Sequence, residues 1–279
     1  MPNLHTNGTT LHYVERGVGD ETLVFSHGFL LDSTHFAPQI EELSEQHRCI
    51  AYDHRGHGKS ERPTGGYHLE NLYADAVGLI ESLGNGPVHF VGLSTGSFIG
   101  LRLGIRRPDL LKSLTLIGTS AAEEPIRKRI RYELMLQFVR ATGFAILGDY
   151  LMSLAFASQS LGDPARQEDI IRMRTVLHSN DPEVALAFGH AVVHRRGVLE
   201  QLHRIQVPTS VVVGLEDALQ PVACARKVAE AIRDATLVLI PNAGHVATID
   251  QPYFVTEAIL DQLARSSPAL RDTLPQVRV

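Results

Sequence analysis

The sequence is poor in cysteine, has no excess of positive charge and contains no long apolar run. Only two of its 279 residues are cysteines, Cys49 and Cys224, so a disulfide framework is excluded and both thiols are expected to be reduced. The net charge of −5 leaves no basic footprint for nucleic acid. No stretch reaches the ~18 uninterrupted apolar residues of a membrane span, and the N-terminus lacks the basic and apolar regions of a signal peptide. We therefore expect a cytoplasmic protein with no membrane span and no nucleic-acid partner.

Strand and helix patterns alternate in two parts of the chain. Short apolar runs typical of buried strands alternate with segments of helical spacing up to about residue 121, and the same alternation resumes from about residue 203. This order predicts βαβ units and a mostly parallel sheet. The expected strands are 9–16, 23–26, 49–52, 88–91, 114–117, 210–213 and 237–240, and the expected helices are 36–43, 69–83, 98–105, 223–232 and 253–263.

The stretch between these two parts contains no strand pattern. Residues 122–202 hold only helix-like segments, broken at glycine and proline. Because they interrupt one sheet, we expect a helical lid over the site. The predicted organisation is an α/β core in two parts, 1–121 and 203–265, with the lid at 122–202 between them. The last residues, 266–279, show weak periodicity and predict a tail without packed structure.

The chain is organised around Gly92-Leu93-Ser94-Thr95-Gly96, which follows an apolar run and precedes a helical pattern. A serine on a strand–turn–helix junction sits in a strained backbone, which requires residues without Cβ two positions before and after it. That geometry would raise the Ser94 hydroxyl above the sheet edge. The pattern predicts Ser94 as a nucleophile.

A serine nucleophile needs a base, and the base needs a third group that fixes its tautomer. His245 follows the last predicted strand in Pro241-Asn242-Ala243-Gly244-His245, where its side chain can reach a neighbouring strand end. We predict it as the base. Gly214-Leu215-Glu216-Asp217 follows the preceding strand and supplies two carboxylates. Asp217 is favoured because the loop needs a residue or two to turn back, and Glu216 is the alternative.

An oxyanion formed at Ser94 requires two backbone donors. The start of the helix after Ser94 offers the N–H of Thr95, and the loop after strand 23–26 offers the N–H of Phe29. Gly28 lets that loop pass close to the substrate.

Five motifs in this order resemble the α/β-hydrolase fold superfamily, especially its small capped esterases, enol-lactonases and cofactor-independent haloperoxidases. The resemblance covers about residues 8–265 and rests on His27-Gly28-Phe29, Asp53-x-Arg55-Gly56-x-Gly58-x-Ser60, Gly92-x-Ser94-x-Gly96, Gly214-x-x-Asp217-x-x-x-Pro221 and Gly244-His245. It implies the same five roles for Ser94, Asp217, His245, Phe29 and Thr95, and a structural role for the loop 53–60. Ser97 departs from the family pattern, in which a second glycine is common.

Other polar residues have less specific interpretations. His27 is predicted to be structural, tying loops together beneath the oxyanion donors. Arg195 or Arg196 could bind a substrate carboxylate if either points inward.

The apolar side of the lid is expected to wall the acyl pocket, with Phe138, Phe144, Met152 and Phe156 as the predicted substrate-binding residues.

No cofactor or metal is expected. His190 and His194 are four residues apart, as in a zinc-binding pair, but no Glu follows His190 in the metalloprotease manner and no third ligand is evident. The loop 53–60 lacks the spacing of a phosphate-binding loop. The sequence leaves open whether the chain forms a homo-oligomer.

These observations predict a serine hydrolase that cleaves small carboxylic esters or lactones through an acyl-enzyme. The alternatives are a carbon–carbon bond hydrolase or a cofactor-independent perhydrolase with the same triad, since the pocket decides the substrate. A non-catalytic ligand-binding receptor on this fold is the alternative outside the enzymes. A missing triad member would favour it, and none is missing.

Overall fold

The computed structural model describes residues 2–84 and 86–267. Within these ranges the chain forms one eight-stranded sheet with the order β1-β2-β4-β3-β5-β6-β7-β8. The strands β3 to β8 run parallel, whereas β2 pairs antiparallel with β1 and with β4. The strands are Asn3–Thr6 (β1), Thr9–Arg16 (β2), Thr22–Ser26 (β3), Arg48–Tyr52 (β4), Val88–Leu93 (β5), Leu111–Ile117 (β6), Thr209–Gly214 (β7) and Ala235–Ile240 (β8).

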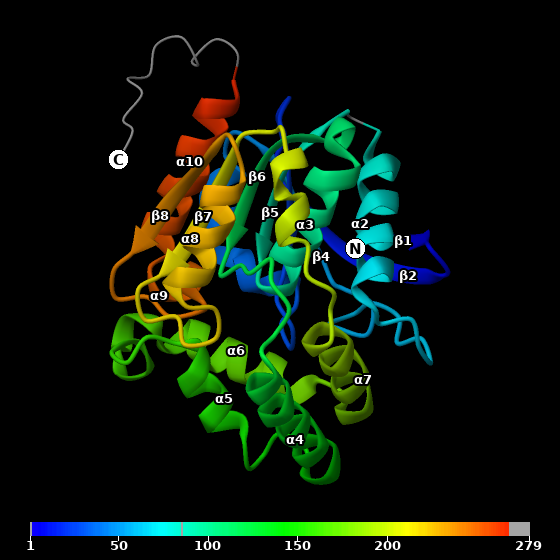
Figure 1. The fold of residues 1–279 in the computed structure, drawn as a ribbon, viewed down its shortest axis with the longest axis vertical. Coiled ribbons are helices and arrows are strands. Elements are labelled where there is room, and N and C mark those ends of the chain that lie inside the picture. The colour runs from blue at the N-terminus through cyan, green and yellow to red at the C-terminus, as the bar shows by residue number, and fades with distance from the viewer. Residues whose placement is uncertain (1, 85, 268–279) are drawn as a thin grey trace.

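Helices cover both faces of the sheet (Figure 1). α2 and α3 pack together, α3 lies against β5 and β6, and α8 lies against β7 and β8, while α1 and α10 pack together on the other face. The core helices are Ala37–Leu43 (α1), Leu69–Leu83 (α2), Thr95–Arg106 (α3), Val222–Ala231 (α8), Ala247–Asp250 (α9) and Pro252–Ser266 (α10), with 3₁₀ turns at Ser33–Phe36, Pro108–Leu110 and Leu199–Arg204.

Successive strand residues feed two apolar cores, because side chains on a strand alternate between its faces. In β3, Val24 belongs to the core beneath α2, α3 and α8, whereas Leu23 and Phe25 belong to the core beneath α1 and α10. All three side chains are fully buried. The central strands are buried on both faces, as expected for a parallel sheet.

Four helices are inserted between β6 and β7, and we call α4 to α7 the inserted helices. Figure 1 shows them gathered at one end of the sheet, in green to yellow-green. They are Ile126–Thr142 (α4), Gly148–Ala155 (α5), Gln167–Ser179 (α6) and Pro182–Val193 (α7), with 3₁₀ turns at Ser160–Gly162 and Pro164–Arg166. The turn Leu199–Arg204 begins within the predicted lid 122–202 but packs against α3 and α8 of the core.

The predicted fold class is confirmed, as an α/β fold with a mostly parallel sheet and a helical insertion. The short edge strand β1 and the four-residue helix α9 had no periodic signal because each is too short to show one. Residues 268–279 of the predicted tail lie outside the described residues. Within the described ranges, each helix is too short or too polar to cross a membrane.

Candidate active site

Ser94 occupies a sharp turn between β5 and α3. Its φ of 53° and ψ of −111° lie in a sparsely populated backbone region that is strained for a residue with a Cβ. A Cβ on Gly96 would lie 2.0 Å from the carbonyl oxygen of Ser26, and one on Gly92 would lie 2.4 Å from the carbonyl carbon of Gly96. Only glycine fits at these two positions, so they fix the tight turn that presents Ser94. The Ser97 hydroxyl donates a hydrogen bond of 2.6 Å to the Ser94 carbonyl oxygen.

Two backbone N–H groups flank Ser94. Thr95 is the first residue of α3, whose N–H has no partner within the helix. The Phe29 loop passes beside the serine, because a Cβ on Gly28 would lie 3.3 Å from the Ser94 Cβ. In the part of the chain that the structure describes, neither the Thr95 nor the Phe29 N–H has a hydrogen-bond acceptor. Both are therefore available to a bound oxygen atom.

Two buried histidines hold the loop that carries Phe29. His27 Nδ1 donates to the Gly28 carbonyl oxygen at 2.7 Å, and its Nε2 accepts from the His54 N–H at 2.9 Å. His57 Nε2 accepts from the Leu30 N–H at 3.2 Å. These contacts require neutral rings, and burial lowers the pKa of both His27 and His57, the latter to about 3. His27 thus ties two loops together, as its position suggested.

Acidification should lower the free energy of unfolding through buried histidines, of which His35 and His57 are two. Burial lowers the pKa of both His35 and His57 to about 3, below the ~6.5 of an unfolded chain. The unfolded state therefore binds more protons, and the free energy of unfolding falls as the pH drops from ~6.5 towards 3. Each histidine should contribute about 1.4 kcal/mol per pH unit in this window. Urea unfolding of wild type and His57→Gln between neutral and acidic pH measures the slope. Equal slopes would contradict the prediction.

His245 and Asp217 are brought together from separate loops. His245 Nδ1 lies 2.8 Å from Asp217 Oδ2, and both side chains are buried. The other carboxylate oxygen, Asp217 Oδ1, accepts from the N–H groups of Leu219 at 2.9 Å and Gln220 at 2.7 Å. With both oxygens occupied, the carboxylate is fixed and favours the His245 tautomer that carries its proton on Nδ1. Glu216, the alternative acid, is exposed and accepts from Ser158.

Gly118, at the end of β6, makes room for this pair. Its φ is 55°, and a Cβ there would lie 2.9 Å from His245 Cε1 and 3.3 Å from Asp217 Oδ2. The sequence placed Gly118 at a strand exit but gave no sign of this role, because the contacts join Gly118 to residues 99 and 127 positions further along the chain.

Residues 155–160 of the insertion form hydrogen bonds with the segments that follow β7 and β8 and carry Asp217 and His245. Asp250 Oδ2 accepts from the Gly244 N–H at 2.7 Å and from the Ala157 N–H at 2.9 Å. The Val246 N–H donates to the Ala155 carbonyl oxygen at 3.1 Å. Burial raises the pKa of the Asp250 carboxyl. Sequence reasoning missed Asp250, whose only signal is a carboxylate five residues after His245.

Ser94 and His245 line one cavity of about 210 Å³ between the core and the inserted helices. Thr95 and Phe29 border it as well. Its wall is predominantly apolar, and α4, α5, α6 and α7 all contribute side chains to it. Among the apolar lining residues are Met135, Leu136, Val139, Phe144, Leu151, Met152, Leu154, Met173, Leu177 and Val192.

One part of the cavity wall is polar and charged. Arg195 lines it and is nearly fully buried, with its guanidinium 4.0 Å above the Phe98 ring centroid. Arg195 Nη2 donates to Glu124 Oε1 at 2.9 Å, and Gln220 Nε2 donates to the same oxygen at 3.0 Å. The cation therefore already has a buried partner. Arg196, the other arginine considered, is exposed and outside the cavity.

Two of the four predicted pocket residues lie elsewhere. Phe144 and Met152 line the cavity. Phe138 is 41% exposed on the outer face of α4, and Phe156 is buried in the core beyond the cavity wall. Phe138 continues an exposed stripe at four-residue spacing, and the neighbouring face of α4 turns inward instead. The other members of the stripe are Ile126, Ile130 and Leu134.

Comparison with known proteins agrees with this geometry. The family described as alpha/beta hydrolase fold matches residues 21–252. A putative carbamate hydrolase RutD of a Caulobacter species is 28% identical over 88% of this chain and 91% of its own. Among solved structures, a thermophilic esterase from Thermogutta terrifontis has 27% identity and a TM-score of 0.88, over 95% of this chain and 99% of its own. An enol-lactonase from Burkholderia xenovorans has 28% identity and a TM-score of 0.86, over 94% and 99%.

The chain therefore belongs to the α/β-hydrolase fold family. Within that family it is a hydrolase with esterases and enol-lactonases among its structural neighbours.

Proposed function

We propose that the protein is a serine hydrolase that cleaves carboxylic esters or lactones with an apolar acyl group. The observation that carries the proposal is that Ser94 and His245 border the same cavity, with His245 Nδ1 lying 2.8 Å from a carboxylate oxygen of Asp217. A serine in a strained turn, a histidine with a fixed tautomer and two free N–H donors are the parts that acyl transfer needs.

In the proposed reaction, Ser94 Oγ attacks the carbonyl carbon while His245 Nε2 takes its proton. Asp217 keeps the other ring proton on Nδ1 and stabilises the imidazolium that forms. The negative charge on the substrate oxygen is held by the N–H groups of Phe29 and Thr95, each worth about 3 kcal/mol of barrier. His245 then protonates the leaving alcohol. A water molecule, deprotonated by the same ring, releases the acid from Ser94.

The composition of the cavity wall supports an apolar substrate. Most of the lining side chains are aliphatic or methionine, and the buried cation Arg195 is matched by Glu124. A substrate carboxylate would have to compete with Glu124 for that cation. The inserted helices supply much of the wall, which supports a role for them as a cap that sets chain-length preference.

Other reactions that use the same catalytic residues would give different results in the test below. Carbon–carbon bond hydrolysis and peracid formation need the same nucleophile and base, and a carbamate would be attacked in the same way. The apolar wall favours the ester or lactone with a hydrocarbon acyl chain.

The test is hydrolysis of p-nitrophenyl esters from acetate to laurate, beside panels of lactones and carbamates, with and without a serine-directed phosphonate. We expect phosphonate-sensitive turnover, with kcat/KM rising up to about fourfold per added methylene until the cavity is filled. Stoichiometric labelling of Ser94 without ester or lactone turnover would overturn the substrate class. Neither turnover nor labelling would overturn the enzyme and favour a binding protein.

Phe144→Leu and Phe138→Leu form a matched pair for the same assay. The first changes the cavity wall and should shift the chain-length optimum, whereas the second changes an outward-facing ring and should not.

A further inference from the structure

The inserted helices α4 and α7 bring together a cluster of side chains outside the cavity. His190 lies in the last turn of α7, His194 caps the C-terminal end of that helix one turn further on, and Glu133 reaches both from α4. Glu133 Oε1 is 2.8 Å from His190 Nδ1 and 3.1 Å from His194 Nε2. The three ligand-type atoms all lie within 4.8 Å of one another. The sequence showed the histidine pair but not its third partner, which lies 57 positions away.

We propose that Glu133, His190 and His194 form a zinc site that clips α4 to α7. Two imidazole nitrogens and one carboxylate oxygen are a donor set that Zn²⁺ takes in proteins, with a fourth position left for water. Tetrahedral coordination with bonds of about 2.1 Å separates ligand atoms by about 3.4 Å. The two oxygen–nitrogen separations, 2.8 and 3.1 Å, are slightly shorter than this value, and all three atoms lie within 4.8 Å of one another, so small side-chain rotations admit the ion.

The three side chains converge on one point. The two imidazole ring centroids are 4.4 Å apart, and both rings aim a nitrogen at the same carboxylate oxygen. One ion placed among these atoms could be bound by all three groups.

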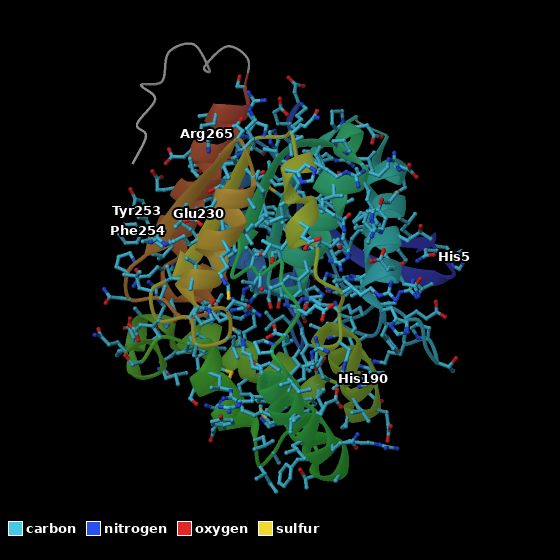
Figure 2. The ribbon with its side chains drawn as sticks, viewed as in Figure 1. His5, His190, Glu230, Tyr253, Phe254 and Arg265 are labelled. Atoms are coloured by element: carbon cyan, nitrogen blue, oxygen red, sulfur yellow. The ribbon has the colours of Figure 1, made fainter. Side chains whose placement is uncertain are left out.

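Exposure allows an ion to enter from solvent. The side chains of His190 and His194 are 55% and 40% exposed, and that of Glu133 is 27% exposed. Figure 2 shows His190 on the inserted helices, far from His5 at the edge of the sheet.

The site lies directly behind the cavity wall. Gly189 precedes His190, and a Cβ there would lie 2.5 Å from a methyl of Leu136 and 2.9 Å from the Phe29 ring. The two helices therefore cross closely at this point. Leu136 and Gly189 both line the cavity, so a clip on the outer side of the crossing would hold two segments of the proposed substrate pocket in place.

The experiment is calorimetric titration of Zn²⁺ into the full chain after dialysis against a chelator, together with thermal unfolding with and without the ion. Wild type should bind one ion saturably and unfold at a higher temperature when loaded. His190→Ala and His194→Ala should each lose at least about tenfold in affinity. His5→Ala, an exposed histidine elsewhere, serves as the matched control and should bind as wild type does.

Glu133→Gln keeps the side-chain size and a hydrogen-bond acceptor but removes the ligand charge, so it carries the test if a histidine variant fails to fold. It should weaken binding at least about tenfold. Ser94→Ala should retain binding, which separates this site from the proposed hydrolysis. Absence of saturable binding by wild type, or undiminished binding by both histidine variants, would overturn the proposal.

Discussion

Replacement of Ser94 by alanine is expected to reduce kcat for the best ester by about 10⁴- to 10⁶-fold. The loss is large because the acyl-enzyme cannot form, and the residual rate comes from the oxyanion donors and substrate binding. Alanine tolerates the positive φ of 53° no worse than serine does. The free energy of unfolding should therefore change by less than about 1 kcal/mol. Initial rates and urea unfolding on the same preparation measure both quantities.

Ser97→Ala is the control for this variant. It removes one local hydroxyl, whose hydrogen bond goes to the Ser94 carbonyl oxygen, and leaves the proposed nucleophile intact. It should retain most of the activity. Substantial turnover by Ser94→Ala would remove Ser94 from the mechanism.

The second large effect is expected for Asp217→Asn, with a fall in kcat of about 10³- to 10⁴-fold. Two backbone N–H groups, from Leu219 and Gln220, already occupy one side-chain oxygen. The asparagine must therefore place its carbonyl oxygen there and turn its NH₂ group towards His245 Nδ1. That group donates, so the ring would carry its proton on Nε2, the tautomer that cannot accept from Ser94.

Glu216→Gln is the matched control, since it makes the same chemical change at the neighbouring carboxylate. Glu216 is exposed and binds Ser158 rather than His245. Its kcat should stay close to that of wild type. A large loss in Glu216→Gln with little loss in Asp217→Asn would exchange the two assignments.

The core of the fold was predictable because its signals are local. The run 88–91, the flanking glycines and the helical spacing after Ser94 all lie within twenty residues. His245 and Asp217 could be placed by position because parallel strands end at one edge of a sheet, so the loops that follow them converge. The structure brings these two side chains to hydrogen-bonding distance.

The inner wall of the cavity was not predictable in the same way. α4 has apolar side chains on several faces, so spacing alone does not say which face turns inward. The stripe that ends at Phe138 has regular four-residue spacing and yet faces out, whereas Leu136 and Val139 face in. What decides the orientation is the close crossing of α4 over Gly189 of α7, a tertiary contact with no local signature.

The roles of Gly118, Glu124 and Asp250 were also invisible to the sequence. Each acts on a partner that is distant in the chain or is a backbone group, such as the His245 ring for Gly118 and the Ala157 N–H for Asp250. A single sequence does not record such pairings.

The ties between residues 155–160 and the loops of Asp217 and His245 bear on how this protein could be re-engineered. A chimera that borrows all of the inserted helices from another member of the family would also replace the partners of Asp250, Glu216 and Val246. The loop that carries His245, the proposed general base, would then lose its present hydrogen-bond partners, and low activity in such a hybrid would not report on its pocket. Exchange points placed before α5 and after α6 would keep residues 155–160 native. The part of the cavity wall supplied by α4 and α7 could then be varied without disturbing the loops of Asp217 and His245.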